Sequence, residues 1–265
     1  MFLFVVQVLF VWLAERLWDA VVWPVNLVRD FPVRLGRILQ TLLPAGRGLV
    51  TAVLALMQAI RTGATSEWLK DTGKGTIGWM YLLLTQIFDL VGGPEIAQFF
   101  MHLITHTTPL TADEIALAGS VLGSKALRWG EVRVAEGGLL DLIFRLNGNL
   151  AFATWRTVYL PRTGRHTRTN LPILVHELTH VYQYERVGTR YLGEAIYVLV
   201  KTRRQCYAYG GEVGLKTAVA AGQRYCHFNR EQQAQIIQDY CARKLQGADV
   251  SAYEPILAQC RAGDV

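Results

Sequence analysis

The chain has 265 residues, of which 51% are hydrophobic and only 18% are charged, and its mean hydropathy is +0.21. A net charge of +6 arises from 27 Lys and Arg against 21 Asp and Glu, but the densest basic runs, residues 162–168 and 201–204, are short. Nucleic-acid binding would need a continuous basic stripe with exposed aromatic side chains, so no nucleic-acid partner is expected. The length suits one large domain or two smaller ones.

The apolar excess lies in the first 95 residues, which contain apolar runs at 2–23, 48–60 and 76–91. Each run is predicted to be helical. Pro24 is expected to end the first helix and residues 92–94 (Gly-Gly-Pro) the third, because proline and glycine interrupt helices. This predicts an all-helical N-terminal region.

Two interpretations stay open for this N-terminal region, residues 1–95. In the first, the helices pack against each other and against the rest of the chain. In the second, they dip into a bilayer or lie on its surface. Membrane association is slightly favoured because tryptophan is enriched at membrane interfaces. The tryptophans concerned are Trp12, Trp18, Trp23, Trp68 and Trp79. A single-pass anchor in the first 23 residues is a further possibility, whereas no cleaved signal peptide is expected.

A change in residue pattern near residue 95 begins a second predicted domain, residues 96–265. After a helix at 95–105, Thr111 and Glu114 form a predicted capping box that starts another helix. Period-two alternation, with β-branched and aromatic residues, predicts strands. The predicted strands are residues 131–135, 151–155 and 157–160. The predicted fold class is therefore α+β, with a small mixed sheet.

The segment 174–184 contains the pattern H-E-x-x-H, formed by His176, Glu177 and His180. On a helix, residues four apart lie on one face, so the two imidazoles can bind one Zn²⁺ ion. Zinc makes a bound water more acidic, and the adjacent Glu177 can then act as the general base. The apolar residues around the motif indicate a buried helix, which would tolerate these polar groups poorly unless they were paired.

Residues 108–184 resemble the zincin-like metallopeptidase domain found in extracellular contractile injection system loci and in Vgr-associated proteins. The matching pieces are Pro109-Leu110-Thr111, Val132-Arg133-Val134, residues 151–154 with Val158-Tyr159, and residues 176–183. The resemblance implies a zincin-like fold with an active-site helix and an association with a secretion system. Together with the apolar N-terminal region it predicts a membrane-associated, secreted or delivered bacterial protein, with a cytoplasmic location as the alternative. The strand ending at Tyr159-Leu160 is the expected edge strand, able to pair with an extended substrate.

A third zinc ligand must come from outside the motif. The metzincin continuation is absent, so a glutamate is expected, as in gluzincin-type sites. The candidates are Glu185, Glu194, Glu212 and Glu231. Glu231 is preferred, because Asn229 caps a predicted helix there and the small Ala234 would let two helices approach closely. An ordinary first-turn glutamate on a solvated helix is the alternative.

Several polar residues are candidates for supporting roles. Tyr207, Tyr209 and His227 are possible donors to a tetrahedral oxyanion, and Asp239 could orient a ligand histidine. No C-x-x-C spacing is present, so the four cysteines are compatible with two disulfides or with four thiols.

These features predict a zinc metallopeptidase that hydrolyses a peptide or protein substrate, with zinc held by His176, His180 and Glu231. The alternative is a zincin-fold protein with a structural or membrane-inserting role that binds zinc but cleaves little. If the protein is a peptidase, Glu177→Gln should abolish cleavage while zinc stays bound, whereas in the alternative the wild type itself cleaves no peptide. A third possibility, a cytosolic peptidase that cleaves a regulator, predicts free thiols at all four cysteines.

Overall fold

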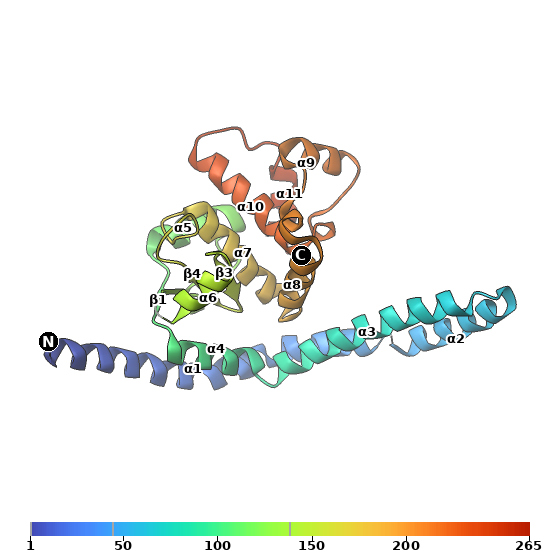
Figure 1. Ribbon diagram of the computed structural model, residues 1–265, viewed down its shortest axis with the longest axis horizontal. Helices are drawn as coiled ribbons and strands as arrows, with labels where there is room; N and C mark the ends of the chain where they lie inside the picture. Colours follow the sequence, from blue (N-terminus) through green and yellow to red (C-terminus); the bar gives the residue numbers. More distant parts are fainter. Residues whose placement is uncertain (1, 44, 138) are drawn as a thin grey trace. The chain divides into compact units, whose positions relative to one another are not determined.

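The computed structural model describes residues 2–43, 45–137 and 139–265 (Figure 1). The chain divides into two compact units, residues 17–96 and residues 1–16 with 97–265. The first unit is helical, and the second combines helices with a four-stranded sheet. The α+β class with a small mixed sheet is therefore confirmed.

The first unit is built from long helices. These are α1 (Phe2–Leu42), α2 (Ala45–Thr62) and α3 (Thr65–Leu90), and α4 (Gly93–Ile104) begins at its end. The expectation that a helix ends at Pro24 is wrong, because α1 continues through both Pro24 and Pro32. A proline removes one backbone donor and costs a helix about 3 kcal/mol, which helical segments on both sides can outweigh. The turn after α3 does fall at Gly92, whose φ of +80° suits glycine.

A buried ion pair holds the first unit together. Arg34 is almost fully buried, and its Nη1 donates to Oε2 of Glu95 at 3.0 Å and to the carbonyl of Asp89. Gln86 Nε2 also donates to Thr41 Oγ1 at 2.8 Å, which ties α3 to α1. Among the described residues no helix is both long enough and sufficiently apolar to cross a bilayer.

The sheet of the second unit has the order β1-β2-β4-β3. Its strands are β1 (Thr107–Pro109), β2 (Arg133–Glu136), β3 (Phe152–Thr154) and β4 (Thr157–Leu160). The β2–β4 pair is parallel, whereas β1–β2 and β3–β4 are antiparallel. The prediction that β4 is an edge strand is wrong, because a tight turn at Trp155 (φ +52°) folds β3 back onto its free side. The edge strand beside the site is therefore β3.

Helices surround the sheet in the second unit. They are α5 (Ala112–Leu122), α6 (Leu140–Leu146), α7 (Leu171–Val187), α8 (Arg190–Thr202), α9 (Gly211–Ala220), α10 (Arg230–Leu245) and α11 (Glu254–Arg261). Every residue from Leu174 to Tyr184 of α7 is buried, so this helix runs through the core. Short 3₁₀ segments, including η2 (Arg203–Tyr207), connect the helices. All four cysteines are free, so the two-disulfide alternative is wrong.

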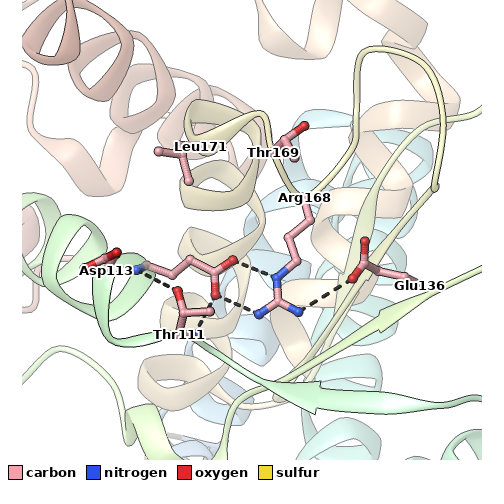
Figure 2. Close-up of a pocket in the computed structure, with 7 residues that line it drawn as sticks. Thr111, Asp113, Glu136, Arg168, Thr169 and Leu171 are labelled. Atoms are coloured by element: carbon pink, nitrogen blue, oxygen red, sulfur yellow. Dashed lines mark hydrogen bonds and ion pairs between the residues drawn. The ribbon is translucent and has the colours of Figure 1, made fainter.

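The polar loop before α7 is anchored by Arg168 (Figure 2). Its guanidinium makes two 2.7 Å contacts to the Glu114 carboxylate, and its Nη1 donates to Thr108 Oγ1 at 2.7 Å. Glu114 also forms the predicted capping box with Thr111, which is confirmed. The basic run at 162–168 is therefore not simply a solvated loop, because Arg168 joins it to the start of α5 and to β1.

Candidate metal centre

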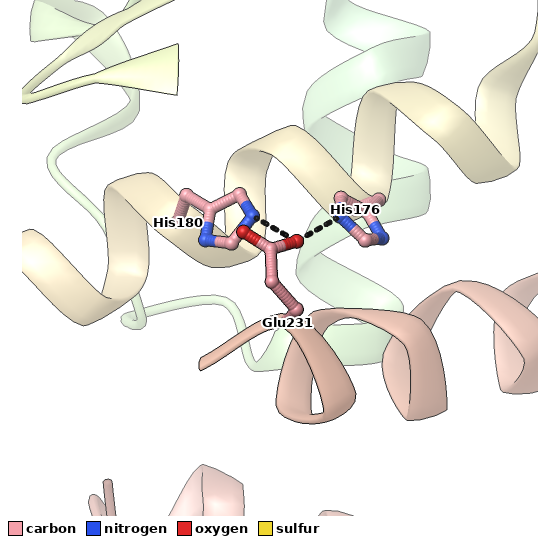
Figure 3. Close-up of side chains that lie close together, drawn as sticks. All are labelled: His176, His180 and Glu231. Atoms are coloured by element: carbon pink, nitrogen blue, oxygen red, sulfur yellow. Dashed lines mark ion pairs between the residues drawn. The ribbon is translucent and has the colours of Figure 1, made fainter. Parts of the chain in front are cut away.

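The two motif histidines lie one turn apart on α7, and both are buried. The Nε2 atoms of His176 and His180 each lie 3.5 Å from Oε2 of Glu231 (Figure 3). Ligand atoms of the three residues all lie within 4.8 Å of one another, so this buried group could hold a metal ion. The structure therefore brings the predicted pair of imidazoles together with Glu231, the preferred of the four candidate glutamates.

Glu231 reaches this point because of how α10 begins. The Asn229 side chain caps the helix by accepting from the backbone N–H groups of Glu231 (3.0 Å) and Gln232 (2.9 Å). Glu231 thus lies in the first turn, where the helix dipole favours a negative charge. Ala234, one turn later, is fully buried, and a small side chain there allows α10 to pack closely on α7.

A fully buried amide sets the orientation of His180. Gln183 Nε2 donates to the carbonyl of Arg230 at 2.9 Å and to Gln233 Oε1 at 3.0 Å. Its Oε1 therefore faces His180 Nδ1, 2.8 Å away, and accepts a hydrogen bond from that nitrogen. Because Nδ1 carries the proton in the neutral ring, Nε2 presents a lone pair toward Glu231. This is the tautomer that a metal-binding imidazole requires.

The electrostatics of the group favour a positive charge at its centre. Burial by itself would raise the pKa of Glu231, but the two imidazoles hold that pKa well below its usual range. Burial would likewise lower the pKa of His180, but the Glu231 carboxylate raises it to about 9. Three electron-pair donors that converge in a buried place repel one another unless a proton or a cation lies between them. The donor set therefore fits a divalent metal.

Glu177 is buried beside the histidines and lines the same pocket. Burial raises the pKa of its carboxyl group, and its Oε2 has no hydrogen-bond partner among the described residues. His176 Nδ1 is also buried without such a partner. Buried polar atoms are normally paired, so both atoms mark a place where a further polar group is missing.

The pocket has a volume of about 530 Å³ and two walls. One wall is the start of β3 with the loop before it, including Leu150 and Phe152, and the other is α8. Tyr191 of α8 joins the walls, because its Oη accepts from the Trp155 backbone N–H at 2.9 Å and donates to the Ala153 carbonyl at 3.2 Å. His176, His180 and Glu231, the candidate metal ligands, therefore line a pocket between a sheet edge and a helix.

Tyr207 lines this pocket together with Tyr191, and its ring centroid lies 6.0 Å from that of His176. Burial raises the pKa of its hydroxyl group, so Tyr207 stays protonated and can donate a hydrogen bond. The sequence predicts three possible oxyanion donors, Tyr207, Tyr209 and His227, and of these Tyr207 lines the pocket. Its position at the end of the 3₁₀ segment after α8 depends on tertiary packing.

The other candidate residues lie elsewhere in the second unit. Tyr209 donates its hydroxyl hydrogen to Asp239, so these two bind each other and not the ligand histidines. His227 is exposed, and its Nδ1 accepts from the Arg224 backbone N–H at 3.1 Å. None of Tyr209, His227 and Asp239 lines the pocket. The prediction that they support the site is therefore wrong.

The rejected glutamates have ion-pair partners of their own. Glu185 contacts Arg128 and Arg156, with Arg156 Nε 2.6 Å from its Oε1. Glu194 accepts from Arg230 Nε at 2.7 Å, which ties α8 to the first turn of α10. Glu212 binds Lys216 on the exposed side of α9.

No role at the site is assigned to Gln183 from the sequence, although in the structure it bonds to His180. Its position three residues after His180 places it beside that ring on α7, and this spacing was the available signal. Its partner Gln233 lies on α10, fifty residues away along the chain, and no local pattern links them. Compared with family models, curated proteins and solved structures, the chain matches none.

Proposed function

We propose that this protein is a zinc-dependent peptidase. The observation that carries the proposal is the convergence of two imidazoles and a carboxylate in a buried group at a pocket that Glu177 also lines. Two histidines and one glutamate are a ligand set of catalytic zinc sites, which leave a coordination position open. Magnesium and calcium prefer oxygen ligands alone, so the imidazoles favour zinc.

The chain's own residues can supply the remaining chemistry. A zinc ion held by His176, His180 and Glu231 would polarise a substrate carbonyl and make a water molecule more acidic. The Glu177 carboxylate takes a proton from the water as the water oxygen bonds to the carbonyl carbon of the substrate. Glu177 then gives this proton to the leaving amine as the C–N bond breaks, and the products are a carboxylic acid and an amine.

Tyr207 is the proposed stabiliser of the developing negative charge. Its protonated hydroxyl can donate to the carbonyl oxygen as that oxygen becomes anionic. Gln183 has a positioning role, because it holds the His180 ring with Nε2 directed at Glu231. These assignments keep the acid–base residue, the oxyanion donor and the ligand-orienting residue distinct.

The proposed substrate binds as an extended peptide along β3. This strand has one neighbour, β4, among the described strands, and its residues Phe152 and Ala153 line the pocket. A free strand edge can bind a peptide by main-chain hydrogen bonds. A role in a bacterial injection or secretion system is proposed only from the resemblance of residues 108–184, and a role at a membrane only from the apolar helices and tryptophans of residues 1–95.

The test combines metal analysis with peptide cleavage. Wild-type protein should bind one zinc per chain, whereas His176→Ala and Glu231→Gln should lose most of it. Glu254→Gln is a matched control, because Glu254 is also a first-turn glutamate, on α11, but faces Tyr240 and Arg261. It should keep its zinc.

Glu177→Gln then separates catalysis from metal binding. It should retain zinc and lose cleavage of a peptide library by at least about a thousandfold, because general-base catalysis and proton delivery both fail. Zinc retained in Glu231→Gln would contradict the ligand assignment. Absence of cleavage by the zinc-loaded wild type across the library would instead favour the structural alternative.

A further inference from the structure

Helix α6 lies just before the loop that supplies Asn147 and Leu150 to the pocket, and it carries large apolar side chains on two faces. Leu140 and Phe144 are buried against Ala135 and Tyr159 of the sheet. The opposite face carries an exposed stripe with helical spacing of three and four residues. This stripe consists of Leu139, Leu142, Ile143 and Leu146, and Leu146 is 81% exposed. Nothing in the fold of the second unit requires large apolar side chains there.

Helix α8, one wall of the pocket, carries a second apolar stripe. Ile196, Leu199 and Val200 line the pocket and are also exposed, Val200 to 76%. They continue the spacing of Leu192 and Ala195, which line the pocket deeper on the same helix. The wall of the pocket therefore extends outward as an apolar surface.

The residues of the α6 stripe do not line the pocket themselves, but the stripe ends at Leu146, next to Asn147, which does. The loop after α6 supplies Asn147 and Leu150 to the wall facing α8. Arg203 is the only Lys or Arg among the described lining residues, and the only acids are Glu177 and Glu231. Scattered apolar residues are common on protein surfaces, but apolar groups that continue out of a polar-centred pocket indicate a binding surface.

We propose that these stripes, together called the apolar rim, bind large apolar side chains of the substrate on both sides of the bond to be cleaved. The occupant is an extended polypeptide segment rich in residues such as Leu, Ile, Val and Phe. Continuity of the α8 stripe with the pocket, and the β3 residues Phe152 and Ala153 that line the same pocket, favour this occupant. The cleavage part rests on the proposed peptidase function, whereas the binding part does not.

The experiment measures peptide binding to full-length, zinc-loaded Glu177→Gln protein by fluorescence anisotropy. Two ten-residue peptides of equal net charge are compared, one with Leu, Ile and Phe at alternate positions and one with Ser, Thr and Asn there. The apolar peptide should bind at least about tenfold more tightly, because burying one or two large apolar side chains is worth at least that factor.

Substitutions in the Glu177→Gln background then locate the binding surface. Val200→Asp should weaken binding of the apolar peptide about tenfold, since it removes an apolar contact and buries a charge. Val213→Asp is the matched control: Val213 is also a helical valine, 77% exposed, but lies on α9 and does not line the pocket. The affinity of the Val213→Asp protein for the apolar peptide should stay unchanged. Leu146→Asp tests the α6 half of the rim in the same way.

The outcomes distinguish the two proposals. Equal affinity for both peptides, or equal effects of Val200→Asp and Val213→Asp, would overturn the rim proposal. So would a wild-type dimer, detected by sedimentation, that Val200→Asp dissociates, because the rim would then bind a second copy. Tight, rim-dependent binding without cleavage by the wild type would support the rim and refute the peptidase. Equal cleavage of both peptides by the wild type would support the peptidase and refute the rim proposal.

Discussion

Replacing Gln183 by leucine would remove the amide that links the two ligand-bearing helices. In the wild type this side chain bonds His180 Nδ1 on α7, and both the Arg230 carbonyl and Gln233 Oε1 on α10. Leucine is similar in size but offers no polar atom. The His180 Nδ1–H group and the Arg230 carbonyl would then be left buried without this partner.

The expected magnitude follows from these contacts. Loss of a partner that orients a metal-binding histidine typically lowers metal affinity by about 10–100-fold, which corresponds to about 1.4–2.8 kcal/mol. An unsatisfied buried polar group costs about 1–3 kcal/mol. Gln183→Leu should therefore bind zinc 10–100-fold more weakly, and its metal-free form should lose about 2–4 kcal/mol of unfolding free energy.

Competition with a chromophoric zinc chelator measures the affinity, and urea unfolding of the metal-free protein measures stability. Gln183→Glu is the informative companion variant, because a carboxylate still accepts from His180 Nδ1 but cannot donate to the Arg230 carbonyl. Its zinc affinity should stay within a few-fold of wild type although its stability falls. If Gln183→Leu binds zinc as tightly as wild type, the orienting role assigned to Gln183 is wrong.

Three further predictions concern stability. Protein treated with a chelator should have an unfolding free energy about 4 kcal/mol lower than protein kept at a free zinc concentration a thousandfold above Kd. The loss should appear as a lower Tm, and an unchanged Tm would count against a bound metal. Arg34→Leu should cost about 3–5 kcal/mol by leaving Glu95 buried without its cation, and Arg34→Leu/Glu95→Leu should recover most of it in urea unfolding; equal losses in both variants would contradict the ion-pair argument. Burial would raise the pKa of Glu114, but hydrogen bonds from Arg168 and Thr111 lower it. The stabilisation that Glu114 gives is therefore fully present above its pKa in the unfolded chain, and it is lost as the pH falls through its lower pKa in the folded protein. Glu114→Gln should therefore cost about 2 kcal/mol at pH 7 and much less once the pH is below the lowered, folded-state pKa of Glu114, and a difference from wild type that is independent of pH would refute this.

Local sequence patterns were sufficient for the features that depend on neighbouring residues. The capping boxes at Thr111 and Asn229 involve residues three apart, and the spacing of His176 and His180 places both on one helix face. The mixed α+β class followed from helical and alternating patterns in separate segments. Such features can be predicted because the interacting groups are separated by one turn or one strand.

Tertiary structure decided whatever depends on residues far apart in the chain. The reversal at Trp155 made β3, and not β4, the sheet edge, and strand order is not encoded in alternation. Helix packing selected Glu231 from four candidate glutamates, Tyr207 from the candidate phenols, and the bond from Gln183 to Arg230 across 47 positions. The sequence by itself determined which chemical groups were available, and the packing of α7 on α10 decided which of them meet, because burial and contact between distant segments have no local signature.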